Sequence, residues 1–162
     1  MTIHEELQQA LNEQVTAELE AALVYLQLSY ALDDLGLVGM RDWMKKQHKE
    51  ELDHAERFSQ HLLDRDVTPQ IGNISAPIVK VETAIDAFEA ALNHEKMISE
   101  RIRRLADLQA THRDYDSRPL IDFFLAEQIE EEADIDEILD RLKLAGTEGS
   151  GILRIDGELG RR

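Results

Sequence analysis

The chain has 162 residues, enough for one domain with a sizeable core, and it contains no cysteine, which excludes disulfides, thiolate catalysis, iron–sulfur ligation and zinc ribbons. Lysine and arginine number 18 against 34 aspartate and glutamate, so the net charge is −16. This charge argues against binding to nucleic acid or to an anionic membrane and makes cations the natural partners, although acidity also simply keeps a protein soluble.

Helix-favouring residues dominate, and glycine and proline gather in a few short breaks. We expect long helices over about residues 4–33, 40–66, 81–110 and 119–144, and a short one within 152–159. The brief breaks at 33–39 and 111–119 imply antiparallel hairpins. Segment 67–79 has two prolines and no helical period, and an extended chain of that length could run along a whole helix.

The sequence therefore predicts an all-α fold, a four-helix bundle with a long crossover between the second and third helices and a short fifth C-terminal helix. We expect one domain over residues 1–162. No basic-then-apolar segment precedes the first helix, and no apolar run is long enough to span a bilayer. We therefore expect a cytoplasmic protein.

The second expected helix has polar residues on the face that should be apolar. Its apolar stripe includes Met44 and Phe58. Between them lie Gln47, Glu51 and His54, at gaps of three and four that keep one helix face. Polar groups in the middle of a buried face are costly unless something satisfies them.

The other three helices have the same kind of interruption near their middles. Glu18 interrupts the apolar stripe of the first helix, and Glu95 interrupts that of the third helix. The fourth stripe begins at Leu120 and includes Gln128 and Glu131. Each residue alone has a plainer explanation, such as a carboxylate that reaches solvent or a hydrogen-bonded pair. Together, four carboxylates at one depth could not all ionise without a counter-charge, which bound dications would supply.

The type of ion follows from the donor atoms. The set is rich in oxygen and has one imidazole, that of His54. Structural zinc usually takes more cysteine or histidine, and calcium rarely takes imidazole. Carboxylates and histidine inside a helix bundle are typical of di-iron or di-manganese sites.

Five stretches in order along the chain resemble bacterial non-haem ferritins. They are LNEQVTAELEAALVYLQLS, EELDHAERFSQHLLDRD, NHEKMISERI, AEQIEEEADIDEILDRLKLAG and GILRIDGEL. The fourth helix has Gln128-x-x-Glu131 where the general di-iron pattern has Glu-x-x-His, and Leu52 stands where bacterioferritins have their haem-binding methionine. The resemblance is therefore to ferritins without haem.

The resemblance implies iron storage and detoxification in a homo-oligomeric shell of 24 subunits around a mineral cavity. It also implies ferroxidase activity, the oxidation of Fe²⁺ by O₂ or peroxide at a di-iron centre within each subunit. Carried over by position, the first iron would be held by Glu18, Glu51, His54 and Glu95, with Glu51 bridging. The second would be held by Glu95, Gln128 and Glu131.

The same resemblance assigns four further residues. Glu50, Glu127 and Glu130 match a third iron site on the cavity side, although exposed glutamates beside a core pair are a plainer explanation. Tyr25 matches a family tyrosine that could donate a hydrogen bond or an electron to the centre, or simply belong to the core.

Two other functions remain open from the sequence. One is a di-iron oxidase or oxygenase that acts on another substrate, and the other is a metal-free bundle that serves as an interaction module. Ferritins commonly admit iron near the start of the fourth helix, but here Arg118 lies between Asp116 and Asp122. We therefore assign no channel residues.

Overall fold

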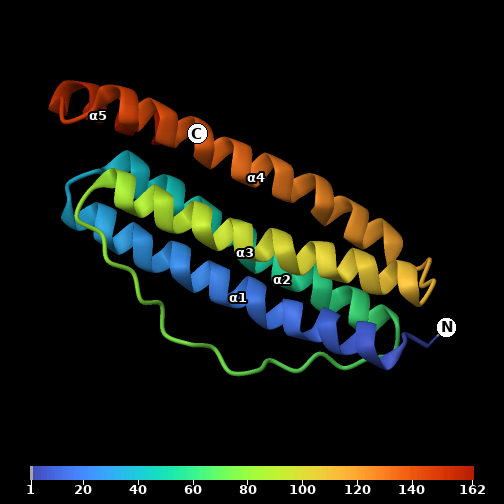
Figure 1. The fold of residues 1–162 in the computed structure, drawn as a ribbon. Coiled ribbons are helices and arrows are strands. Elements are labelled where there is room, and N and C mark those ends of the chain that lie inside the picture. Colours follow the sequence, from blue (N-terminus) through green and yellow to red (C-terminus); the bar gives the residue numbers. More distant parts are fainter. Residues whose placement is uncertain (1) are drawn as a thin grey trace.

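Four long helices and one short helix make up residues 2–162, the part of the chain that the computed structural model describes (Figure 1). The helices are α1 (Glu5–Asp34), α2 (Val38–Asp64), α3 (Ala84–Thr111), α4 (Arg118–Ala145) and α5 (Gly149–Leu159). No strand occurs among these residues. The predicted all-α bundle with a short fifth helix is confirmed.

The chain forms two antiparallel hairpins, α1 with α2 and α3 with α4, and α1 also contacts α3 (Figure 1). α5 packs against α2 and α4 at one end of the bundle. None of the helices described here is both long and apolar enough to cross a membrane.

Most helix ends lie within two residues of their predicted positions; α3 begins three residues later than predicted and α5 three residues earlier. α3 begins at Ala84 because Thr83 forms a capping box, in which its hydroxyl accepts from Asp86 N and the Asp86 carboxylate accepts from Thr83 N. α2 ends at Asp64, and Asp66 follows in the left-handed conformation with a φ of 59°.

The hydrophobic core consists of two separate clusters, one toward each end of the bundle. The first includes Tyr25, Trp43, Phe88 and Ile135, and the second includes Leu11, Phe58, Ile102, Ile121 and Phe124. The predicted fourth stripe was wrong at its start, because Ile121 is buried whereas Leu120 is only half-buried. Between the clusters each long helix contributes polar side chains, which form the site described below.

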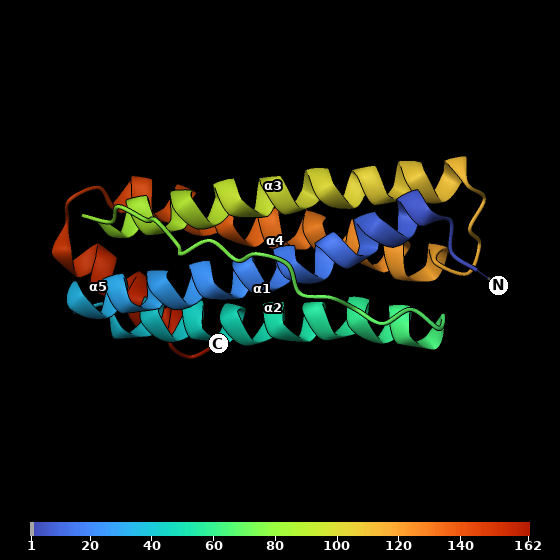
Figure 2. The same ribbon diagram turned by 90° about the horizontal axis from the view of Figure 1, so that it is seen from below.

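The crossover, residues 65–83, runs along the bundle beside α1 (Figure 2). Three α1 side chains, each one turn from the next, bind its backbone: Asn12 at Gln70, Thr16 at Gly72 and Glu20 at Ser75. The Asn12 amide bonds both the N–H and the carbonyl of Gln70, at 2.7 and 2.9 Å. The predicted long crossover is therefore present and attached to the polar face of α1.

The end of the bundle opposite α5 is closed by a partly buried ion pair. Arg65, just after α2, binds both carboxylate oxygens of Asp114 at 3.1 Å, and Asp114 also accepts from Ser117 N. His61 Nε2 lies 2.8 Å from Ser117 Oγ. These contacts join the end of α2 to the turn between α3 and α4.

At the other end, Asp156 of α5 caps α2. Its carboxylate accepts a hydrogen bond from Met40 N at 2.8 Å, and the Arg141–Glu158 ion pair joins α5 to α4. Gly39 makes this approach possible, because a Cβ at that position would lie 1.8 Å from Asp156 O.

We therefore expect Gly39→Ala to destabilise the protein by about 1–3 kcal/mol, the usual cost of forcing an extra methyl into a packed contact. Urea denaturation and limited proteolysis around residue 146 would measure the loss of α5 packing. Gly157→Ala in α5 is the matched control, since a Cβ there meets nothing within 4 Å. Equal stability of the two variants would contradict the role of Gly39.

Candidate metal centre

A layer of polar side chains crosses the middle of the bundle between the two apolar clusters. It contains the six predicted ligands: Glu18 from α1, Glu51 and His54 from α2, Glu95 from α3, and Gln128 and Glu131 from α4. None of the six is more than 6% exposed. The structure therefore brings together, inside the bundle, residues that the sequence placed on four separate helices.

Glu18, Glu51 and His54 form one compact group, with one potential ligand atom from each lying within 4.8 Å of the other two. His54 Nδ1 is 3.3 Å from Glu51 Oε2 and 3.9 Å from Glu18 Oε2. Glu51 and His54 meet because they are three residues apart on one helix face. This group contains three of the four ligands predicted for the first iron; Glu95, the fourth, is not part of it.

His54 also belongs to a second group, with Glu127 and Glu131. Its Nε2 lies 3.9 Å from Glu127 Oε1, so the two ring nitrogens face two different groups of carboxylates. The Glu127 side chain is 28% exposed, whereas Glu131 is buried. This second group therefore connects the buried layer with the surface of the bundle.

Glu95 is held by neutral donors. The Tyr25 hydroxyl donates to Glu95 Oε1 at 2.5 Å, and Gln128 Nε2 donates to Glu95 Oε2 at 3.0 Å. Glu95 belongs to neither compact group, although the sequence analysis assigned it to both iron sites. Its carboxylate faces Tyr25, the tyrosine that the resemblance placed near the centre.

Three carboxyl groups of the layer, those of Glu18, Glu51 and Glu131, resist ionisation because their pKa values are raised. Burial raises the pKa of Glu18, and the neighbouring Glu51 carboxyl raises it further. Burial and the Glu95 charge raise the pKa of Glu51, and the same two causes raise that of Glu131 to about 8. Burial also raises the pKa of Tyr25, so its hydroxyl stays a donor.

Two buried oxygen atoms in the layer have no hydrogen-bond donor, Glu18 Oε2 and Gln47 Oε1. An orphaned carboxylate oxygen beside the Glu51 carboxyl is a costly arrangement unless a proton or a cation occupies the space between the two groups. The donor chemistry and the orphaned oxygens therefore fit a divalent cation.

Three polar partners of the ligands complete the layer. Gln14 donates to Glu18 Oε1 and Gln47 to Glu131 Oε2, both at 2.8 Å, and Ser99 accepts from Gln128 Nε2 at 3.2 Å. Gln47 is part of the predicted polar interruption of α2, whereas Gln14 and Ser99 are not among the predicted residues. Both lie four residues from a predicted ligand, Gln14 before Glu18 and Ser99 after Glu95, so helical spacing was the signal that could have found them.

The residues matched to a third iron site are not gathered into one group. Glu127 lies near His54, as described above. Glu50 is partly exposed, 3.8 Å from Arg162, and its charge contributes to the raised pKa values of Glu51 and Glu131. Glu130 is exposed.

Comparison with known proteins gives consistent matches over nearly the whole chain. The ferritin-like domain family matches residues 8–145. A bacterial non-heme ferritin of Bacteroides fragilis is 34% identical over 160 residues, 99% of each chain, and one of Escherichia coli is 31% identical over 95% of this chain and 93% of its own. An open pore ferritin from the archaeon Archaeoglobus fulgidus superposes with a TM-score of 0.97 at 31% identity, over 100% of this chain and 99% of that chain.

Because the folded state raises the pKa of Glu131 to about 8, it favours the protonated carboxyl. The stability that this proton provides is complete below the unfolded pKa near 4.5 and is lost as the pH rises toward 8. We expect Glu131→Gln to stabilise the metal-free protein at pH 8 by about 1–2 kcal/mol and to change it little at pH 5.

Urea denaturation in the presence of a chelator at both pH values would measure this difference. Glu137→Gln, at an exposed position of the same helix, is the control and should leave the pH dependence unchanged. If Glu131→Gln behaved like this control, the carboxyl would not be neutral in the folded, metal-free protein.

Proposed function

The chain belongs to the ferritin-like domain family, and on that premise we propose that it oxidises Fe²⁺ in the buried polar layer and stores the ferric product. The observation that supports this most is the gathering of four buried carboxyl groups and one imidazole from all of the long helices. Only a cation lets these carboxylates ionise together inside an apolar bundle. The curated relatives with which the chain aligns over nearly its full length are named bacterial non-heme ferritins.

The proposed first iron is held by Glu18, Glu51 and His54, the compact group whose atoms already lie within 4.8 Å of one another. Glu51 is suited to bridge two ions because its carboxyl interacts with that of Glu18 and also with the charges of Glu95 and Glu131. Carboxylate oxygens favour the harder Fe³⁺ over Fe²⁺. The ligand set therefore assists the loss of one electron from each Fe²⁺ to O₂ or peroxide.

The proposed second iron is held by Glu95, Gln128 and Glu131. For this the Gln128 amide, which now donates to Glu95, would turn its oxygen toward the ion. An amide oxygen is a weak ligand, and the imidazole nearest to Glu131 is that of His54, which the first ion also uses. A loosely held second ion suits a site whose product must leave for storage.

Tyr25 keeps its proton and directs it at Glu95 Oε1. We propose that this hydrogen bond positions the Glu95 carboxylate until iron arrives, and that the ring, buried at the edge of the layer, could also supply an electron. Glu127 contacts the layer through His54 and is partly exposed, so it could pass ions between the layer and solvent. In this proposal Glu50 and Glu130 are the outer members of a third iron site.

Storage requires a closed compartment, and we propose the shell of 24 subunits that the resemblance implies. The net charge of −16 per chain would concentrate cations at such a shell and offer carboxylates on which hydrolysed Fe³⁺ can nucleate. The fold of a ferritin from Archaeoglobus fulgidus, matched at a TM-score of 0.97, supports a ferritin-type assembly.

Aerobic loading with excess Fe²⁺ tests the whole proposal. We expect many irons per chain to be oxidised into a soluble, protein-bound ferric core, with the assembly eluting near the mass of 24 chains in size-exclusion chromatography. Oxidation that stops after a few irons per chain, followed by precipitation, would instead favour a di-iron oxidase with another substrate. Absence of oxidation would favour a metal-free bundle.

The paired substitution Glu51→Ala with His54→Ala removes the two central ligands of the first group. We expect it to slow the initial Fe²⁺ oxidation by about 100-fold or more while the shell still assembles. Stopped-flow absorbance would follow the rate. Glu56→Ala, at an exposed position of the same helix, should oxidise iron at the original rate, and an unchanged rate in the double variant would contradict the site assignment.

Zn²⁺ should compete for the same ligands, because sites with nitrogen and oxygen donors generally bind it more tightly than Fe²⁺. We expect two equivalents of Zn²⁺ per chain to slow Fe²⁺ oxidation by roughly tenfold at low iron. Oxygen consumption measured with and without Zn²⁺ would show this, and Mg²⁺ at the same concentration should have little effect. Equal rates with Zn²⁺ and Mg²⁺ would mean that oxidation occurs elsewhere.

A further inference from the structure

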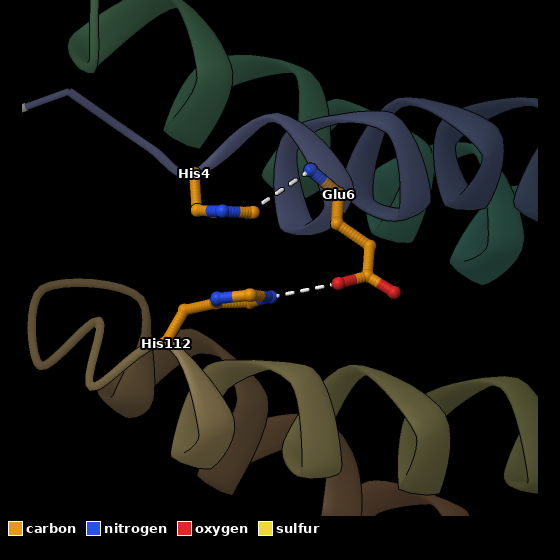
Figure 3. A group of neighbouring side chains, drawn as sticks. All are labelled: His4, Glu6 and His112. Carbon is orange, nitrogen blue, oxygen red and sulfur yellow. Dashed lines mark hydrogen bonds and ion pairs between the residues drawn. The ribbon is translucent and has the colours of Figure 1, made fainter.

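A second group of metal-binding side chains lies outside the polar layer, at the end of the bundle where α1 begins (Figure 3). His4 is the N-cap of α1, Glu6 lies in the first turn of that helix, and His112 is the C-cap of α3. One potential ligand atom from each lies within 4.8 Å of the other two. The proposed iron chemistry uses none of these residues.

The three side chains are already arranged toward one another. His112 Nε2 lies 2.8 Å from Glu6 Oε2, and the two imidazoles stack with centroids 3.6 Å apart and planes 9° from parallel. His4 Nδ1 accepts a hydrogen bond from Glu6 N at 3.3 Å. Ile3, only 2% exposed, anchors the segment that carries His4. The group is thus supported by packing from one side and open to solvent on the other.

Its donor set differs from that of the buried layer. Two imidazoles and one carboxylate are nitrogen-rich, a set that suits Zn²⁺, Cu²⁺ and Ni²⁺ better than Mg²⁺ or Ca²⁺. Three protein ligands on an exposed surface leave at least one coordination position for water. An ion between Glu6 and His112 would take the place of their hydrogen bond. For His4 to bind the same ion, its ring would tilt out of the stack and give up the hydrogen bond from Glu6 N.

We propose that His4, Glu6 and His112 form a second metal site, which binds one late first-row divalent ion such as Zn²⁺ per chain. The ligands come from two helices, and His112 is 106 residues from Glu6. An ion bound there joins the start of α1 to the end of α3 only in the folded chain. It therefore stabilises the fold in proportion to its concentration.

Zn²⁺ titration by calorimetry in 0.15 M salt tests the site. The background is the Glu51→Ala, His54→Ala variant, so that the buried layer contributes little and the result does not depend on iron oxidation. In this background we expect one Zn²⁺ site per chain, weakened at least tenfold by either His112→Asn or Glu6→Gln. Circular dichroism confirms that each variant remains helical.

His48→Asn is the matched control, because His48 lies on α2 and bonds only the Ala22 carbonyl. It should leave the affinity of the site unchanged. Electron paramagnetic resonance of bound Cu²⁺ gives a second readout, with coupling to two imidazole nitrogens expected and to one after His4→Asn. Unchanged Zn²⁺ affinity in both His112→Asn and Glu6→Gln would overturn the proposal.

Discussion

The structure depends on the crowding of carboxyl groups in a dry layer between two apolar clusters. Four carboxyl groups of the layer are nearly inaccessible to water: those of Glu18, Glu51, Glu95 and Glu131. The single imidazole of His54 cannot balance four negative charges, and the Tyr25 hydroxyl offers a hydrogen bond but no charge. Without a cation the layer must hold protons instead, as the raised pKa values of Glu18, Glu51 and Glu131 show. In the proposed function, the same crowding that weakens the metal-free bundle favours the binding of divalent ions.

The layer is asymmetric, and the asymmetry has a chemical meaning. His54, on α2, presents one nitrogen to Glu18 and Glu51 and the other toward Glu127. On the other side, Glu131 stands where the general di-iron pattern has its second histidine, and the Gln128 amide is occupied with Glu95 and Ser99. In the proposed function, one half of the layer would hold its ion firmly and the other would hold an exchangeable one. Such a difference suits a site that passes iron on better than one that retains it permanently.

Much of this arrangement could be predicted from the sequence. An interrupted apolar stripe indicates which face of a helix is buried and how far along the helix the polar residues lie. Glu51 and His54 were found in this way, and antiparallel packing then placed Glu18 and Glu131 beside them. The start of the fourth stripe was misplaced by one residue, since Leu120 and Ile121 are both apolar and only the packing decides between them. The Tyr25–Glu95 contact joins residues 70 apart, and the His4–His112 stack joins residues still farther apart. The periodicity of residues within one helix cannot predict contacts between such distant residues.

The division of the chain into two hairpins has a consequence for the order of folding. Each hairpin closes a short turn and can zip outward from that turn, whereas docking of the two hairpins must wait until the crossover between them is laid along α1 through Asn12, Thr16 and Glu20. Each hairpin carries half of the carboxylates, so the docking of the two halves is opposed by their mutual repulsion. A dication bound by the first hairpin through Glu18, Glu51 and His54 would reduce this barrier. The ligand would then help to assemble the subunit as well as occupy it.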